Sequence, residues 1–520
     1  MGHTTGIYMS VAKERIIENI KDKKTFLIVL TIFWWYIIFI KRAFNMESLA
    51  GCSNWTVVMM FMAYGFTIIA SYVCCLMVNK LDEKSFLVIA VLLGGIMIFA
   101  NPFVHIMDES THYFRSFAIS EGQWIDIIDE NGEIGAIMPE NYYKFQIKLN
   151  LKSVIENQDF FGESYSDTNA FSRNPYMSSV LPTNHAIAAV GIFLANLFNA
   201  PIWVVMWVSR IFDLAVYIIL CYWAIKIAKY YKSFYFVSAL LPMSIWLAAS
   251  CSQDPIVNGA TMLFISICLK YKWGDEQYVS KLDTVAILMC GFSIASVKYL
   301  VYSPVLLLYF VIPKEKFKKN QRGIMIALAI IIVIVCVAGQ FYLLDKFPYK
   351  EDRNGDVDMA RQIAFILDSP IAAFRIFTDY VSNHVLWHLE NFWYESATGL
   401  LCQWAGIFGI AAAPVLAKDK YQWKEEDKKK ERGFSLLMIF IVSVVTILTV
   451  IALYLGFTPV AKPGVDGLQT RYFIPVLFPI MYLLSKLDVI NNIKKYELMV
   501  ANIMMLGILD MIAKGLLDTF

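Results

Sequence analysis

The chain has 520 residues, 58% of them hydrophobic and only 17% charged, and its formal net charge is +2 at pH 7. Soluble proteins carry about 25% charged residues, so the composition excludes an ordinary soluble protein, and the near-neutral charge gives no sign of a nucleic-acid partner. The surplus apolar surface requires lipid around it. This predicts an all-α polytopic membrane protein with one integral membrane domain over residues 1–520.

About thirteen apolar stretches are candidates for membrane-spanning helices. A helix needs about 20 mainly apolar residues to cross the hydrocarbon core. The predicted spans lie near residues 25–45, 55–78, 85–104, 201–227, 234–250, 254–270, 283–297, 299–312, 323–345, 399–417, 433–455, 472–486 and 495–514. The stretch before the first span is polar and has no small-residue cleavage site, so we expect no signal peptide.

Lysine and arginine gather in four connectors, and such residues favour the cytoplasmic side of a membrane. The connectors are residues 226–232, 270–281, 314–322 and 418–432. This orientation predicts a cytoplasmic N-terminus and two long extracytoplasmic segments, residues 105–200 and 346–398. The apolar stretch 182–199 would break the charge bias if it crossed, so we expect a helix at the outer surface. Outside the cell, nucleotide sugars and ATP are absent, so any substrate donor would have to be carried by a lipid.

The stretch "HIMDESTHYFRS" (105–116) places acids, histidines and an arginine directly after a predicted span. If it is helical, Asp108 and His112 are four residues apart, and Glu109, His112 and Arg115 follow at steps of three. The four side chains then share one helix face, which is typical of a site. The alternative for the two acids is N-terminal capping of the helix, since carboxylates favour that end.

Further polar residues stand at the predicted outer ends of other spans. They are Gln253 and Asp254 in "CSQDP", Lys298 in "SVKYL", and Gln469, Arg471 and Tyr472 in "KPGVDGLQTRYFIP". A single cation at a span end can be an anchor that reaches the membrane interface. The gathering of several cations and an acid pair on one side of the membrane favours a binding site.

Other residues could line a substrate pocket or serve the structure. Arg210 and Asp213 stand three apart within a span, where they can pair with each other or face a pocket. In the second long segment, Trp387 could stack on a sugar or belong to the aromatic belt of the interface. His384 and His388 have a chelating spacing without an obvious third ligand. The nine cysteines show no metal-binding spacing either, so we predict no metal.

Two motifs carry a family resemblance. "DESTHYFRSFAISEG" (108–122) resembles the D-E-x-x-H-x-x-R-x-x-x-I-x-x-G segment of a large bacterial family of polytopic membrane proteins of unknown function. "GLQTRYFIPVLFP" (467–479) is similar to that family's second motif, Q-G-R-Y-F-x-P, with Thr470 in place of the usual glycine. The resemblance extends over roughly residues 85–490. The family is grouped with the GT-C superfamily of glycosyltransferases, which implies a GT-C-like helical fold.

The resemblance implies a membrane glycosyltransferase that transfers a sugar from a polyprenyl-phosphate donor to a cell-envelope acceptor, with inversion at the anomeric carbon. Asp108, with Glu109 as its substitute, would take the proton from the acceptor hydroxyl. Arg471, Arg115 and Lys298, together with His112, would bind the donor phosphate. The expected substrate-lining residues are Gln469, Asp254, Gln253, Arg210, Trp387, His388 and Tyr472. We expect no cofactor beyond the lipid-linked sugar.

Two alternatives and several details stay open. A transporter or flippase of lipid-linked glycans would fit the composition, although such proteins often carry internal repeats, which this sequence does not display. A polymerase or ligase of lipid-linked glycans would use a similar outer site. The acceptor could be a polysaccharide, a teichoic-type polymer, a lipid or a protein, and the oligomeric state is open. Frequent Lys, Ile and Asn favour a bacterial plasma membrane as the location.

Overall fold

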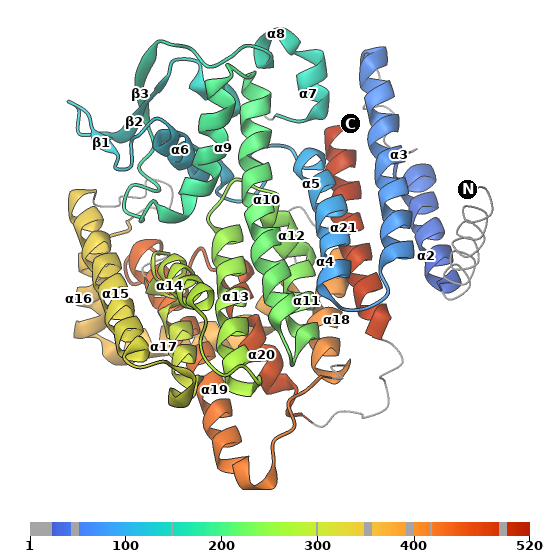
Figure 1. Ribbon diagram of the computed structural model, residues 1–520. Coiled ribbons are helices and arrows are strands. Elements are labelled where there is room, and N and C mark those ends of the chain that lie inside the picture. The colour runs from blue at the N-terminus through green and yellow to red at the C-terminus, as the bar shows by residue number, and fades with distance from the viewer. Residues whose placement is uncertain are drawn as a thin grey trace.

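The computed structural model describes residues 23–42, 51–146, 149–297, 300–347, 356–391, 400–416, 419–487 and 497–520. These residues form a bundle of helices with a small sheet at one end (Figure 1). Helix α10 (Ile202–Ile227) runs through the middle of the bundle and packs most extensively against α13 (Asp254–Trp273) and α9 (Ala186–Leu197). The prediction of a helical, multi-pass membrane protein is confirmed.

Seven helices in the described part of the chain are long and apolar enough to cross a membrane. They are α2 (Lys24–Trp35) continued by η1 (Tyr36–Arg42), α3 (Asn54–Met77), α4 (Glu83–Ile89) continued by η3 (Ala90–Gly94) and α5 (Gly95–Ala100), α10 (Ile202–Ile227), α15 (Gln321–Lys346), α19 (Lys428–Gly456) preceded by η9 (Glu425–Asp427), and α21 (Glu497–Thr519). Seven is fewer than the thirteen expected, and the larger number stays a prediction.

The difference arises from helices between residues 232 and 484 that are too short or too little apolar to count among these seven. They are α11 (Lys232–Leu240), α12 (Pro242–Ala248), α13 (Asp254–Trp273), α14 (Lys281–Ala295), η7 (Ser303–Val311), η8 (Lys314–Lys316), α18 (Leu400–Leu416), η10 (Thr470–Val476) and α20 (Leu477–Leu484). The predicted span 234–250 is two helices, because Pro242 cannot continue α11 and instead begins α12. The predicted span 299–312 is a tight 3-10 helix over most of its length rather than an α-helix.

The first long segment adds a small three-stranded sheet, which the sequence did not predict, to a structure that is otherwise helical, as expected. Its elements are α6 (Glu109–Ser120), β1 (Ile127–Ile128), β2 (Ile134–Pro139), η4 (Tyr142–Gln146), α7 (Leu151–Glu156), α8 (Gln158–Phe161), β3 (Asn169–Arg173), η5 (Thr183–His185) and α9 (Ala186–Leu197). The strands pair antiparallel in the order β1-β2-β3, with Ile128 opposite Ile134 and Ile137 opposite Phe171. The first hairpin turns at Asn131-Gly132, where Gly132 has a φ of +82° that glycine accepts without strain.

The second long segment contains α16 (Met359–Asp368) and α17 (Pro370–Asn391). The Asp358 carboxylate caps α16 by accepting a hydrogen bond from the Arg361 amide at 2.9 Å. The aromatic stretch 370–399 is predicted from the sequence as a surface helix that dips into the membrane interface. Its described part is helical over residues 370–391, and its place at an interface stays a prediction. The predicted helix within 182–199 is α9, and its buried face packs against α6 and α10.

Helix α9 approaches α10 closely at Gly191. A Cβ atom added at Gly191 would lie 2.8 Å from Cδ2 of Phe212 and 3.2 Å from the Val208 carbonyl oxygen. Both atoms belong to α10, so this glycine allows the first long segment to dock on the central helix. A larger residue would have to push the two helices apart.

We expect Gly191→Ala to lower the free energy of unfolding by about 1–3 kcal/mol, as is typical of overpacked interfaces. The matched control is Gly65→Ala in α3, where an added Cβ meets nothing within 4 Å and alanine favours the helix. Thermal unfolding of the purified protein in detergent measures both. Equal unfolding temperatures for the two variants would contradict the tight α9–α10 contact.

Candidate functional site

Asp108 stands at the N-terminus of α6 in a strained conformation. Its φ is +59°, in the left-handed region that few residues other than glycine occupy, although Asp tolerates it better than most. Its side chain makes no capping hydrogen bond to the helix, which removes the capping alternative. About half of the side chain (49%) is exposed. Strained residues of this kind concentrate at functional sites.

The Asp108 carboxylate faces Arg471, which comes from the far end of the chain. Nη2 of Arg471 lies 2.5 Å from Oδ2 of Asp108, and Nη1 donates to the Met107 carbonyl at 3.2 Å. Nη1 also lies 3.5 Å from Oδ2 of Asp254. Only 2% of the Arg471 side chain is exposed, and its guanidinium lies over the Tyr472 ring at 5.6 Å. One buried cation therefore serves two carboxylates from different parts of the sequence.

The three charged side chains come together because each lies at the N-terminal end of a helix. Asp108 precedes α6, Asp254 opens α13 with Pro255 in its first turn, and Arg471 lies in the first turn of η10. Thr470, at the position where the resemblance predicts glycine, has no positive φ and is buried, so the backbone here does not require glycine. Tyr302, also buried, lies close enough to Asp254 and Arg471 to interact with their charges.

Two glutamines flank this meeting point. The Oε1 atoms of Gln253 and Gln469 are buried, and neither accepts a hydrogen bond from the described part of the chain. Buried polar atoms are nearly always satisfied by protein, water or ligand. Two such acceptors beside the Asp108–Arg471–Asp254 cluster favour a site that receives a polar ligand.

Glu109 has a structural role, which corrects the prediction that it could substitute for Asp108. Its side chain is fully buried and accepts hydrogen bonds from Nε and Nη2 of Arg210, each at 2.7 Å. It also accepts from the amides of Val104 at 2.9 Å and Cys251 at 3.1 Å. All four donors belong to the protein, so this carboxylate cannot reach a substrate.

Arg210 is likewise structural, which corrects its placement among the substrate-lining residues. Beyond Glu109, its guanidinium donates to carbonyl oxygens in the last turn of α5 and directly after that helix, at 2.8 to 3.1 Å. The carbonyls belong to Ile98, Asn101 and Pro102. Its expected partner Asp213 instead accepts a hydrogen bond from the Ser252 amide at 3.1 Å.

Arg115 does not point to a phosphate site. Its guanidinium forms an ion pair with Asp126 and donates to the Trp124 carbonyl at 2.9 Å, and the residue is fully buried. Burial lowers the pKa of Arg115 and raises the pKa of Asp126, although the two charges oppose these shifts. The arrangement fixes the chain after α6, which corrects the prediction that Arg115 binds the donor.

His112 pairs with a histidine that the sequence did not single out. Nδ1 of His112 lies 2.8 Å from Nε2 of His185, and the two buried rings stack with centroids 5.1 Å apart. Burial, reinforced by His112 and Arg115, lowers the pKa of His185 well below 6.5. His185 therefore stays neutral at pH 7. The signal for it was present, since the chain has only six histidines and one of them interrupts the apolar stretch 182–199.

Three predicted site residues lie partly or wholly outside the described structure. Lys298 is not among the described residues, and neither are the side chains of Trp387 and His388, whose backbone belongs to α17. Among the residues that are described, no group of three or more His, Cys, Asp or Glu is arranged to hold a metal ion.

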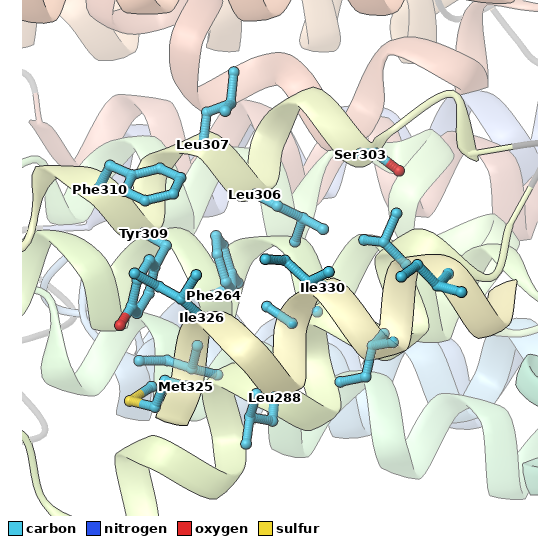
Figure 2. A pocket seen from close by; sticks show the side chains of 16 residues that line it. Phe264, Leu288, Ser303, Leu306, Leu307, Tyr309, Phe310, Met325, Ile326 and Ile330 are labelled. Carbon is cyan, nitrogen blue, oxygen red and sulfur yellow. The ribbon is translucent and has the colours of Figure 1, made fainter. Parts of the chain in front are cut away.

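An apolar cavity of about 330 Å³ lies between α13, α14, η7 and α15 (Figure 2). Its walls are almost entirely hydrocarbon and aromatic, as Phe264, Leu306, Phe310 and Ile330 illustrate in Figure 2. Ser303, which also lines it, directly follows Tyr302 beside the charged cluster. The cavity and the cluster therefore share η7 and α13. A cavity of this chemistry suits a lipid chain.

Glu109 and Asp108 are adjacent acids whose substitutions are expected to lower stability by very different amounts. We expect Glu109→Gln to destabilise the protein by about 3–5 kcal/mol, because it leaves Arg210 buried without its counter-charge. Asp108→Asn, at a half-exposed position, should cost less than about 1 kcal/mol. Unfolding temperatures and the monodisperse yield in detergent compare the two variants. A well-folded Glu109→Gln would show that Arg210 does not depend on this carboxylate.

Comparison with known proteins assigns a family. A family model described as "Predicted membrane protein (DUF2142)" matches residues 86–480. No curated protein and no solved structure matches the chain. The matched range covers more than half of the 520 residues and agrees with the extent of the resemblance found in the sequence. The chain therefore belongs to the DUF2142 family of predicted membrane proteins.

Proposed function

We propose that this protein is a GT-C-type membrane glycosyltransferase that transfers a sugar from a polyprenyl-phosphate donor to an acceptor hydroxyl on the outer face of a bacterial plasma membrane. The observation that carries the proposal is the contact between Arg471 and Asp108, 2.5 Å apart. A buried guanidinium beside a half-exposed carboxylate combines a phosphate-binding group with a base.

Asp108 is the proposed general base. The acceptor hydroxyl gives its proton to this carboxylate as its oxygen forms a bond with the anomeric carbon of the donor sugar. The bond between the anomeric carbon and the phosphate oxygen breaks at the same time, and polyprenyl phosphate leaves with the electron pair. Its left-handed backbone directs Asp108 toward Arg471 rather than along the helix, and its exposure leaves room for an acceptor.

Arg471 is the proposed ligand of the leaving phosphate. Negative charge develops on the phosphate as its bond to the sugar breaks, and a guanidinium in a water-poor site stabilises that charge strongly. The contacts of Arg471 with Asp108 and Asp254 keep the cation in place before the donor binds. The apolar cavity supports a lipid-linked donor, since Phe264 lies ten residues after Asp254 on α13, a rise of about 15 Å.

We expect Asp108→Asn to lower the transfer rate by a factor of about 10²–10⁴, the usual contribution of a general base. The amide keeps the shape of the side chain but cannot accept the proton. Release of polyprenyl phosphate from a lipid-linked sugar, with detergent-solubilised protein, measures the rate. Asp466→Asn, whose carboxylate pairs with Lys462 on the exposed surface, is the matched control. Full activity of Asp108→Asn would exclude the proposed base.

We expect Arg471→Ala to weaken stabilisation of the transition state by about 2–4 kcal/mol, with the loss appearing mainly in the use of the donor. Arg471→Lys should recover only part of the activity, because an ammonium cannot form the two-pronged contact with phosphate. Steady-state rates at varied donor concentration separate the two variants. Unchanged donor turnover in Arg471→Ala would remove Arg471 from this role.

The same assay separates the proposal from the transporter alternative. A transferase consumes a lipid-linked sugar in detergent, where no vesicle and no gradient exist. A flippase moves the intact lipid between the leaflets of a vesicle and leaves it chemically unchanged. Transbilayer movement without any release of polyprenyl phosphate would overturn the assignment.

A further inference from the structure

A second cavity, of about 210 Å³, lies in the first long segment and differs in chemistry from the apolar one. Polar side chains dominate its walls, among them Glu121, Ser164, Asp167, Asn169, Asn196 and Asn199. At about 30 Å³ per water molecule, it holds roughly seven waters, which is comparable to the room needed by one sugar ring. Nothing in the reaction proposed above uses these residues.

The cavity is assembled where several elements of this segment end. Glu121 follows α6, Asn169 begins β3, and Asn196 and Asn199 lie at the end of α9 and just beyond it. Figure 1 shows α6, α9, β2 and β3 gathered at the same end of the molecule. Asp108 begins α6 and Glu121 ends it, so about 20 Å of helix separates the two ends. The cavity thus lies one helix length from the candidate site.

Hydrogen bonds within the segment hold the walls in place. The Ser164 hydroxyl donates to the Asn199 carbonyl at 2.7 Å. The Asn141 side chain donates to the Ser164 carbonyl at 3.0 Å and accepts from the Ser166 amide at 2.9 Å. The Tyr165 hydroxyl lies 3.0 Å from that of Tyr113 on α6. A cavity fixed in this way loses little conformational entropy when a ligand binds.

Three amide groups remain available inside this frame. The side chains of Asn169, Asn196 and Asn199 form no hydrogen bond with the described part of the chain. Asn199 also has a φ of +49°, a left-handed conformation at the bend where α9 gives way to α10. Each amide presents both donors and an acceptor, which matches a ligand whose groups can donate and accept.

The charges around the cavity select among such ligands. Glu121 and Asp167 are its only charged lining residues, and both are acids. Phosphate or carboxylate groups of a ligand would meet like charge, and the described residues that line the cavity include no cation to balance it. Sugar hydroxyls can donate to the carboxylates and pair with the amides, and the half-buried Tyr165 ring offers an apolar surface to the carbon face of a sugar.

We infer that this cavity binds an uncharged sugar unit of the acceptor glycan, one helix length from the site of transfer. That the sugar belongs to the acceptor depends on the proposed function, whereas the binding of a neutral sugar is inferred from the cavity alone. An acceptor that reaches both places is an oligosaccharide chain rather than a single sugar. The inference narrows the acceptor class to neutral glycans and excludes phosphate-linked polymers such as teichoic chains.

Saturation-transfer NMR with the full-length protein in detergent tests the inference. The probes are neutral tetrasaccharides of glucose, N-acetylglucosamine, galactose and rhamnose, with a glycerol-phosphate oligomer as the anionic comparison. We expect at least one neutral probe to bind and the anionic oligomer not to bind. Asn169→Ala combined with Asn196→Ala should weaken the neutral probe about tenfold, as expected for two or three lost hydrogen bonds. Asn131→Ala, in the exposed β1–β2 turn, is the matched control and should bind normally.

The outcomes for the cavity and for the transferase are separate. Three results would overturn the cavity proposal: binding of the anionic oligomer, no binding of any neutral probe, or equal binding by the Asn169→Ala/Asn196→Ala double variant and the Asn131→Ala control. None of them affects the test of Asp108 as the general base. Binding that depends on the asparagines, without any release of polyprenyl phosphate, would support a glycan-binding site in a protein that is not a transferase. If the KM for the acceptor rises in the double variant while kcat is unchanged, the cavity binds the acceptor of the transfer reaction.

Discussion

The buried ion pair between Glu109 and Arg210 is the constraint on which the rest of this region depends. Arg210 reaches from α10 to the carbonyls of Ile98, Asn101 and Pro102, and Glu109 binds the amides of Val104 and Cys251. Two fully buried charges are costly to desolvate, so such a pair is better understood as a determinant of geometry than of net stability. It holds the amide of Val104 and fixes Glu109, the residue directly after Asp108, and both Val104 and Asp108 have a positive φ.

Part of the site followed from the sequence, and the exceptions have physical reasons. The distribution of lysine and arginine predicts that the segments of Asp108, Asp254 and Arg471 lie at the same end of the spans. The three side chains do lie together in the structure. The sequence did not predict that Asp108 and Glu109 have different partners. Adjacent residues on a helix point about 100° apart, and only the position of α10 decides which of the two meets Arg210.

Some parts of the fold were likewise predictable from the sequence and others were not. Long apolar helices such as α3 and α15 were recognisable, because hydropathy over 20 residues is a strong signal. The central helices were recognised less completely. Helix α13 lies close to the predicted span 254–270, although it buries polar residues such as Asn258 and Ser266, whereas Pro242 divides the predicted span 234–250 into two helices. The Asn131-Gly132 turn did signal a hairpin, but two short strands have too little alternation to stand out in a chain this apolar.

Asp108 and Arg471 are separated by 363 positions along the chain. A ribosome delivers residues in order, so the opening segment can fold long before its cation is synthesised. A product that stops short of η10 would insert most of its helices and still lack the guanidinium. The charge pair can therefore form only in a chain that has been translated nearly to its end.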